Sequence, residues 1–210
     1  MQKAIVVDFD GTLLMKNSFE EFYRQLAIYA LSRGRLKLLG ALCFGIVRRK
    51  LRLISHAELK RITLLRLVTE DISSFIESFA KRMQRWIDSR VVKELNDYVV
   101  KGYYAFLSTA APLLYVQPIV DKANIDIGEI LATGCPDNDN WRENCREEKA
   151  RRTLERIQTL RQGLAVLMTD HLDDLPLLKI PKERNVLVNP TEATLRAVSM
   201  HGIPYDVMRS

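Results

Sequence analysis

Five short apolar segments along the chain have the length and composition of buried strands. They are rich in β-branched or aromatic side chains and cover residues 4–9, 103–107, 128–132, 165–168 and 185–188. Helical patterns separate the later segments, which is typical of a parallel sheet with helices on both faces. The sequence therefore predicts an α/β fold with a doubly wound parallel sheet. In such sheets, ligands bind beyond the carboxyl ends of the strands.

The segment between the first two predicted strands has a different pattern. Residues 14–100 show helical periodicity without a strand pattern, and they are too many for a structureless connection. Capping-box spacing predicts helices that begin near Asn17, Ser55 and Ser74, and Asp88 can start another. We therefore interpret residues 14–100 as a helical cap domain inserted into a Rossmann-like core of residues 1–13 and 101–210.

The positive charge is concentrated in this insertion. The chain carries a net charge of +6, but residues 14–100 hold 17 Lys and Arg against 9 Asp and Glu, a local +8. The remainder holds 15 against 17, which is −2, so the two parts sum to +6. A basic surface attracts nucleic acid, anionic lipid or a phosphorylated metabolite. No basic motif interleaved with aromatic residues is present, so we expect no nucleic-acid partner.

The cysteine pattern and the first residues indicate the compartment. Cys43, Cys135 and Cys145 form no CxxC pair and are odd in number, which argues against a disulfide framework or a zinc site. The N-terminal apolar run is short and lacks the basic flank of a signal peptide. We expect a cytoplasmic protein.

Polar residues follow several of the predicted strands. Asp8 and Asp10 leave the first strand two residues apart, and Gly11 permits a tight turn that lets both carboxylates converge on a hard cation. An ordinary Asp-Gly turn is the alternative. Ser108 and Thr109 follow the second strand, where a hydroxyl beside a helix N-terminus forms an anion site or simply caps the helix.

The fourth predicted strand is followed by an acidic cluster. Asp170 and Asp174 are one helical turn apart on one face, with Asp173 between them. Three carboxylates in five residues repel one another unless a cation or base is near. Lys149 opens the helix that leads into this strand, although by itself it reads as part of a solvated charge run. A parallel sheet would gather all these groups at one edge, and this joint pattern predicts a single site.

These residues, in this order, resemble the haloacid dehalogenase superfamily. DFDGT matches its first motif, Leu-Ser-Thr its second, Lys149 its third and TDHLDDLPLL its fourth. The insertion between the first two motifs is similar to the helical cap of the phosphoserine-phosphatase-like subfamily. The resemblance implies a phosphatase that acts on a small phosphorylated substrate.

The resemblance also implies a role for each motif residue. Asp8 would be the nucleophile that forms an aspartyl-phosphate, and Asp10 would be the general acid and base. Mg²⁺ would be held by the Asp8 carboxylate, the Asp10 carbonyl and Asp170. The last acid of the cluster, Asp174, would support Asp170 or Lys149. Binding of the phosphoryl oxygens would fall to Ser108, Thr109 and Lys149.

Departures from the family pattern concern the substrate pocket. Phosphoserine phosphatases carry an acid nine positions after the nucleophile, where this chain has Asn17, so phosphoserine is not the expected substrate. His171 stands where a small residue is common, and Asp173 occupies the place before the last acid. The glycine usual a few residues before Lys149 is missing from residues 142–146.

Other functions compete with this interpretation. The carboxylate of Asp10 argues against dehalogenase or ion-pump chemistry, and phosphomutase chemistry is a less favoured alternative. Residues 36–47 are almost wholly apolar between basic flanks, which suits either the buried core of the cap or an interfacial helix at a membrane. The alternatives are thus a phosphatase of lipid-like phosphates at a membrane surface or a non-catalytic basic binding protein.

Overall fold

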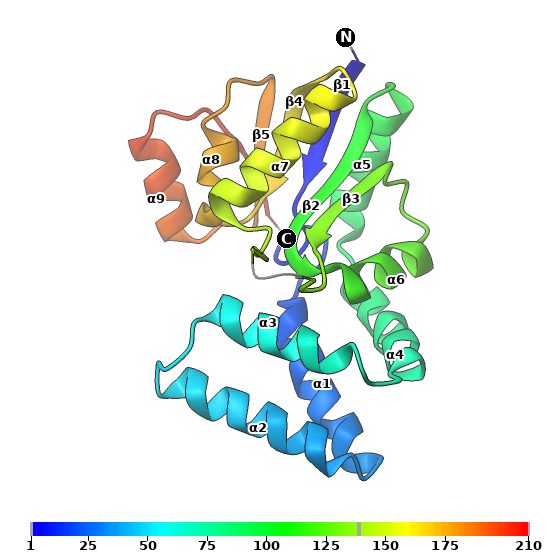
Figure 1. Ribbon diagram of the computed structural model, residues 1–210. Coiled ribbons are helices and arrows are strands. Elements are labelled where there is room, and N and C mark those ends of the chain that lie inside the picture. Colours follow the sequence, from blue (N-terminus) through cyan, green and yellow to red (C-terminus); the bar gives the residue numbers. More distant parts are fainter. Residues whose placement is uncertain (1, 138–139, 210) are drawn as a thin grey trace.

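The computed structural model describes residues 2–137 and 140–209, and its centre is a parallel β-sheet (Figure 1). The strands are β1 (Gln2–Val7), β2 (Tyr104–Pro112), β3 (Glu129–Thr133), β4 (Gln162–Thr169), β5 (Arg184–Val188) and β6 (Asp206–Met208). Their spatial order is β3-β2-β1-β4-β5-β6, and all neighbouring strands are parallel. The predicted α/β fold is therefore confirmed.

The strands differ from the sequence prediction at two places. β6 was not predicted, because it has three residues at the sheet edge and lacks an apolar run. β2 continues to Pro112, well past the apolar segment, so that Ser108 and Thr109 lie within the strand rather than beyond it. The extension pairs with β3, where Ser108 lies opposite Leu131 and Pro112 opposite Thr133.

The regular elements between β1 and β2 are all helical, and Leu14 forms two isolated β-bridges, with Asp10 and Ile87. The helical elements there are α1 (Ser18–Ser32), α2 (Leu36–Lys50), α3 (His56–Leu67), α4 (Ser73–Met83), the 3-10 turn η1 (Gln84–Trp86) and α5 (Ser89–Val100). The later helical elements are α6 (Leu113–Ala123), α7 (Arg146–Thr159), the 3-10 turn η2 (Leu172–Asp174), α8 (Leu175–Leu178) and α9 (Glu192–Met200).

The four predicted helix starts in the insertion are confirmed to within one residue. The side chains of Asn17, Ser55 and Asp88 accept hydrogen bonds from backbone N–H groups in the first turns of α1, α3 and α5. Helix α4 begins at Ser73, next to the predicted Ser74, although its N-cap residue Ile72 provides no side-chain cap. The N–H of Ser73 donates to the Asp71 carboxylate at 3.3 Å.

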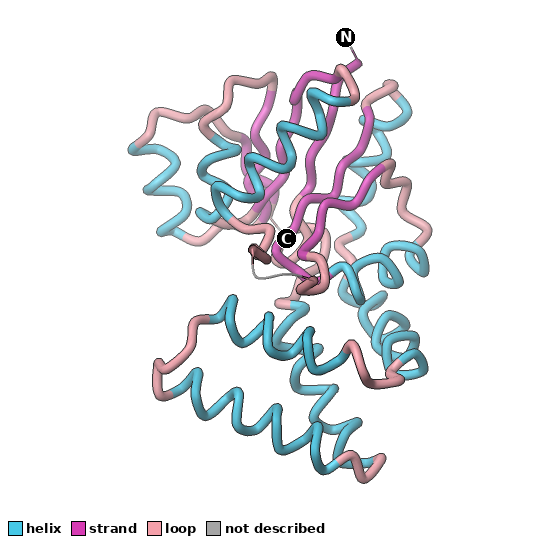
Figure 2. The backbone as a smooth tube through the Cα atoms, in the orientation of Figure 1, coloured by secondary structure: helices cyan, strands magenta, loops and turns pink. Residues whose placement is uncertain are grey.

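Each face of the sheet buries its own apolar cluster because side chains alternate along a strand. Ala4 and Val6 of β1 face the cluster that includes residues of α7, α8 and α9. Ile5 and Val7 face the cluster that includes residues of α5 and α6. Helices consequently cover both faces, and the tube view in Figure 2 shows the strands between these two layers.

Helices α1, α2 and α3 form a lobe beyond the carboxyl ends of β1 and β2 (Figure 1). An aromatic cluster joins this lobe to the core: the ring of Phe22 in α1 lies 4.7 Å from that of Tyr115 in α6 and 5.3 Å from that of Phe79 in α4. These rings are fully buried, which fixes α1 against the core directly below the ends of the strands.

Candidate functional site

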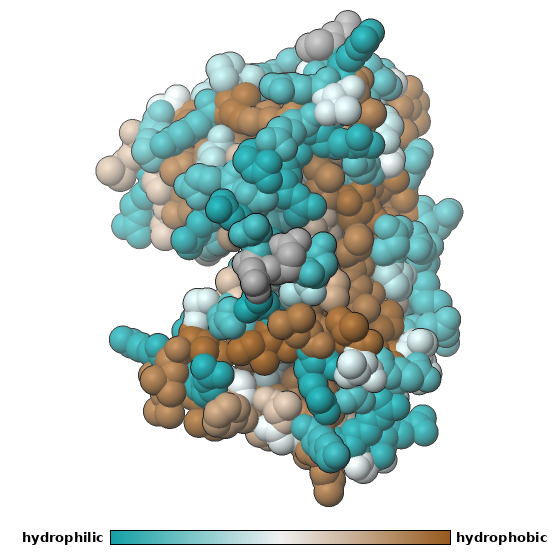
Figure 3. Space-filling view, viewed as in Figure 1, coloured by the Kyte–Doolittle hydropathy of each residue, from teal (hydrophilic) through white to brown (hydrophobic). Residues whose placement is uncertain are grey.

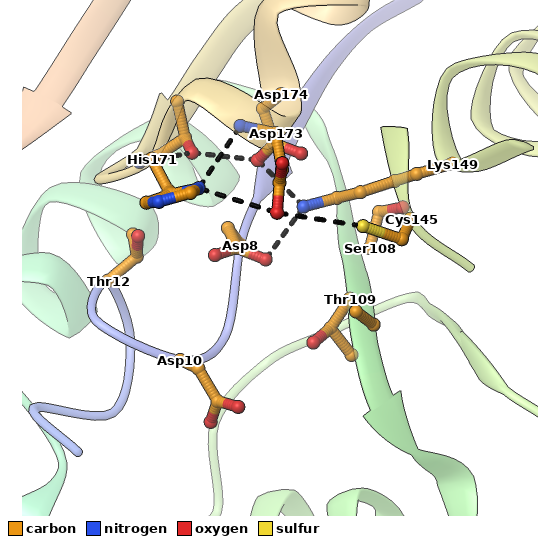
Figure 4. A network of polar contacts seen from close by, with 12 residues as sticks. Asp8, Asp10, Thr12, Ser108, Thr109, Cys145, Lys149, His171, Asp173 and Asp174 are labelled. Carbon is orange, nitrogen blue, oxygen red and sulfur yellow. Dashed lines mark hydrogen bonds and ion pairs between the residues drawn. The ribbon is translucent and has the colours of Figure 1, made fainter. Parts of the chain in front are cut away.

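A cavity of about 440 Å³ lies where the first, second and fourth strands end. The sequence analysis named ten site residues, all of which lie in the described part of the chain, and nine of them line this cavity: Asp8, Asp10, Asn17, Thr109, Lys149, Asp170, His171, Asp173 and Asp174. The structure therefore brings together groups that are up to 166 positions apart in sequence (Asp8 to Asp174). Figure 4 shows most of these side chains from close by.

Ser108 is the exception, and its expected place at the site is corrected by the structure. Its fully buried Oγ shares a hydrogen bond with Thr153 Oγ1 of α7 at 2.8 Å. Successive side chains of a strand point to opposite faces, so Thr109 lines the cavity while Ser108 does not. Of the two hydroxyls expected at the site, the structure therefore places that of Thr109 on the cavity wall and that of Ser108 outside it.

Lys149 places a buried ammonium group beside the acidic residues of the site. Its Nζ donates hydrogen bonds to Asp8 Oδ1 and to Asp174 Oδ2, both at 2.7 Å (Figure 4). Burial lowers the pKa of Lys149, but the Asp174 and Asp8 carboxylates outweigh it and hold this pKa above its ordinary value. Asp174 also accepts a hydrogen bond from Thr169 Oγ1 at 2.7 Å, so the hydrogen bonds from Thr169 and Lys149 together fix the orientation of its carboxylate.

The acidic groups beside Lys149 carry more negative charge than it can balance. Burial raises the pKa of Asp8 to about 7, because Lys149 offsets only part of the cost and the nearby Asp174 and Asp170 carboxylates add to it. The pKa of Asp170 rises to about 6, again mainly through burial. A further cation in the cavity would relieve both shifts.

The donor set at this point suits Mg²⁺. A Cβ atom on Gly11, whose φ is +78°, would lie 2.1 Å from Asp170 Oδ2, so the Asp170 carboxylate rests directly on the backbone that follows Asp10. Among the described residues, no three His, Cys, Asp or Glu side chains form a ready-made metal cage. Two carboxylates with a backbone carbonyl nevertheless match Mg²⁺, which prefers oxygen ligands and keeps several waters.

Asp10 has a separate environment at the first helix of the insertion. Figure 4 shows its side chain directed away from Asp8. Its carboxylate accepts hydrogen bonds from the N–H and the Oγ–H of Ser18, both at 3.0 Å. Burial raises the pKa of Asp10 to about 7, although the Ser18 hydrogen bonds oppose the rise. A carboxyl group with this pKa can donate and accept a proton near neutral pH.

The three residues expected in the substrate pocket lie on the cavity wall. Asn17 Oδ1 accepts from the N–H of Glu20 at 3.1 Å, so this side chain also caps α1. His171 Nδ1 accepts from the N–H of Asp173 at 3.1 Å. The Asp173 carboxylate accepts from Arg146 Nε at 2.8 Å in an exposed ion pair. All three are therefore already held by neighbours within the protein.

Lys60 of α3 contacts the site, and the sequence analysis did not identify it. Its buried Nζ donates to the carbonyl of Ala110, which lines the cavity, at 2.8 Å and forms an ion pair with Glu143. Phe19 lies beneath the same ammonium, whose Nζ is 5.2 Å from the ring centroid. Lys60 is one of 17 basic residues in the insertion, and nothing local distinguishes it from the exposed ones.

Asn144 was also missed, although it lies within the segment where the usual glycine is absent. Its Nδ2 donates to the carbonyls of Leu131 at 2.7 Å and Thr109 at 3.1 Å. Its backbone N–H donates to Thr133 Oγ1 at 3.0 Å. The buried Asn144 thereby ties the ends of β2 and β3 together and fixes the backbone at Thr109.

Comparison with known proteins establishes the family of this chain. A family model described as haloacid dehalogenase-like hydrolase matches residues 5–179, which is most of the sequence. The chain belongs to the haloacid dehalogenase-like hydrolase family. Protein CicA of Caulobacter vibrioides is 26% identical over 190 residues, which cover 86% of this chain and 83% of CicA.

Solved structures show that this haloacid dehalogenase-like hydrolase shares its whole fold with other proteins. A protein of unknown function from Bordetella pertussis Tohama I superposes with a TM-score of 0.74 at 17% identity, covering 99% of this chain and 98% of that protein. A phosphoserine phosphatase in its apo form gives a TM-score of 0.61 at 14% identity, covering 93% and 90%. At these identities the similarity establishes the fold.

The ion pair of Lys60 generates a testable prediction about stability. The substitution Lys60→Met should lower the free energy of unfolding by about 3 kcal/mol, because it leaves the Glu143 carboxylate, whose side chain is only 15% exposed, without its partner. Urea denaturation followed by circular dichroism measures this change. Lys81→Met, at an exposed position of α4, is the matched control and should change it by less than about 0.5 kcal/mol.

The double variant Lys60→Met/Glu143→Leu separates the ion pair from simple packing. It should be more stable than Lys60→Met alone, since no unpaired charge is left buried. If the double variant loses as much free energy of unfolding as Lys60→Met and Glu143→Leu lose together, the two side chains do not act as a pair.

Proposed function

We propose that this chain is a Mg²⁺-dependent phosphatase that hydrolyses a small phosphomonoester through an aspartyl-phosphate on Asp8. The observation that carries the proposal is the placement of Asp8 at the end of β1, in a cavity with one of its oxygens held by Lys149. Membership of the haloacid dehalogenase-like hydrolases supports hydrolytic chemistry. The likeness in fold to a phosphoserine phosphatase agrees with a phosphate ester as the substrate class.

The first step would be attack of Asp8 on phosphorus. Lys149 holds Asp8 Oδ1, which leaves the other carboxylate oxygen to form the new bond to phosphorus. As this bond forms, the bond from phosphorus to the ester oxygen breaks. Asp10, with a pKa of about 7, would donate its proton to that leaving oxygen.

The second step would be hydrolysis of the aspartyl-phosphate by water. Asp10, now deprotonated, would accept a proton from the water as its oxygen bonds to phosphorus and the bond from phosphorus to Asp8 breaks. The hydrogen bonds from Ser18 hold the Asp10 carboxylate in place for both transfers. One residue can therefore act as acid and then as base because its pKa lies close to neutral pH.

The negative charge of the transferring group would be offset by three parts of the site. Lys149 and Thr109 would bind the phosphoryl oxygens at the cavity wall. Mg²⁺ would be held by the Asp8 carboxylate, the Asp10 carbonyl and Asp170. When bound, it would withdraw charge from the phosphoryl oxygens. The free thiols of all three cysteines suit a reducing compartment, and we propose the cytoplasm.

The substitution Asp8→Asn tests the nucleophile. It should lower the rate of phosphate release at least about a thousandfold, because the neutral amide is a poor nucleophile of nearly the same shape. The assay is Mg²⁺-dependent phosphate release over a panel of soluble phosphomonoesters. The melting temperature should not fall, since the buried charge is removed. Asp97→Asn, at an exposed position of α5 outside the cavity lining, is the matched control and should keep the wild-type rate. A wild-type rate in Asp8→Asn would contradict the proposal.

Removal of the metal tests the cation site. Excess chelator should abolish phosphate release, and added Mg²⁺ should restore it, because the anionic nucleophile and substrate otherwise repel one another. In Asp170→Asn, the Mg²⁺ concentration for half-maximal rate should rise about tenfold or more, since one ligand loses its charge. Full activity in chelator, or an unchanged Mg²⁺ requirement in the variant, would show that Asp170 does not hold the metal.

Substrate preference tests the role of Asn17. L-phosphoserine should react with a kcat/KM about 10- to 100-fold below that of the best ester, because no charge at this position pairs with its ammonium group. Asn17→Asp should narrow this gap, and Asn17→Ser should not. Both replacements can cap α1, so the comparison isolates charge. The inference from Asn17 is wrong if phosphoserine proves the best ester.

A further inference from the structure

Helix α2 exposes part of its apolar surface to solvent. Leu36, Phe44 and Val47 have exposed fractions of 69%, 64% and 50%, and Leu51, just after the helix, has 64%. Together with Gly40 these positions follow at intervals of four, four, three and four residues, so they form one stripe along the helix. We call these five residues the α2 stripe.

The opposite face of α2 packs against the rest of the protein. Leu38, Leu42 and Gly45 are buried there, against α1 and α3. Gly45 packs closely: a Cβ atom at this position would lie 2.9 Å from Leu59 and 3.0 Å from Tyr23. The α2 stripe therefore has no role in this packing, and the interpretation of residues 36–47 as buried core holds for only half of the helix.

Basic side chains flank the α2 stripe on both sides. At 100° per residue, Lys37 and Arg48 lie along one edge of the stripe and Lys50 along the other. The guanidinium carbon of Arg48 lies 5.6 Å from the centroid of the Phe44 ring. No acidic residue occurs between residues 22 and 57, which hold eight Lys and Arg. Within residues 22–57, the exposed apolar groups are thus accompanied by positive charge only.

This combination matches the surface of an anionic bilayer. Apolar side chains of an interfacial helix enter the boundary of headgroups and acyl chains, while each Lys or Arg near the anionic surface contributes about 1 kcal/mol. In the described part of the chain, no helix is long and apolar enough to cross a membrane. A symmetric contact with a second copy would bring two positive surfaces together, which is unfavourable.

We propose that the α2 stripe docks this protein on the surface of anionic phospholipid bilayers, with the helix lying in the plane of the interface. Figure 1 places α2 at the end of the lobe farthest from the sheet, so docking there leaves the catalytic cavity uncovered. The space-filling view in Figure 3 shows hydrophobic surface over this lobe. An apolar groove of about 910 Å³ between α1, α2 and α3, with Val47 in its wall, continues this surface.

Vesicle flotation tests the proposal on the full chain. The protein should float with vesicles of phosphatidylcholine and phosphatidylglycerol in equal parts, and remain unbound with phosphatidylcholine alone. The variant Phe44→Asp/Val47→Asp should reduce the partition coefficient about tenfold or more. Lys37→Gln/Lys50→Gln should reduce it about fivefold for each charge removed.

A matched control separates the α2 stripe from exposed apolar residues in general. Val100→Asp/Met200→Asp changes two residues outside the lobe of α1, α2 and α3 that are 87% and 86% exposed, and it should float as well as the wild type. All variants should keep the wild-type melting temperature and rate on a soluble phosphomonoester. Because the readout is flotation, it is independent of the proposed phosphatase activity, and either proposal can fail alone.

Three outcomes would overturn the proposal. The first is that the wild type fails to float with the anionic vesicles. The second is that Phe44→Asp/Val47→Asp floats as well as the wild type. The third is that the free protein is a dimer that this variant converts to a monomer, which would assign the α2 stripe to a second copy of the chain.

Discussion

The central constraint in this protein is the burial of several carboxylates around one ammonium group. Lys149 Nζ contacts Asp8 and Asp174 at 2.7 Å each, while Asp170 lies nearby on the backbone after Asp10. Unpaired buried charges are costly, and burial raises the pKa of Asp8 and Asp170 accordingly. A site with this excess of negative charge favours the binding of a hard cation, which an anionic substrate also needs. The electrostatic cost of the free site and its proposed chemistry thus have the same origin.

The helical insertion takes part in the site as well as covering it. The first residue of α1, Ser18, holds the carboxylate of Asp10, and Lys60 of α3 holds the carbonyl of Ala110. The aromatic cluster of Phe22, Phe79 and Tyr115 fixes α1 against the core, so the position of Asp10 depends on packing between the two parts. Movement of the lobe would therefore change the environment of the group proposed to transfer protons. The far side of the same lobe carries the α2 stripe, which this packing leaves exposed.

Local patterns in the sequence were sufficient for the sheet and for most of the candidate site. Apolar runs identify five of the six strands in the described part of the chain. Polar residues at their ends identify Asp8, Asp10 and Asp170, because parallel strands end at one edge. Caps such as Asn17 were also recognisable, since their acceptors and donors are three residues apart. The roles of these residues in catalysis remain proposals.

Tertiary structure decided those features of the fold and the site that depend on contacts between residues far apart in the chain. Pairing with β3 extends β2, and the alternation of the strand then directs Thr109 rather than Ser108 to the cavity. Lys60 reaches Glu143 across 83 positions, and no local pattern marks it among the other basic residues of the insertion. The apolar run in α2 likewise has the same sequence pattern whether its side chains are buried or exposed. Local periodicity determines which element forms, whereas the face that an element buries depends on neighbours that only the folded chain supplies.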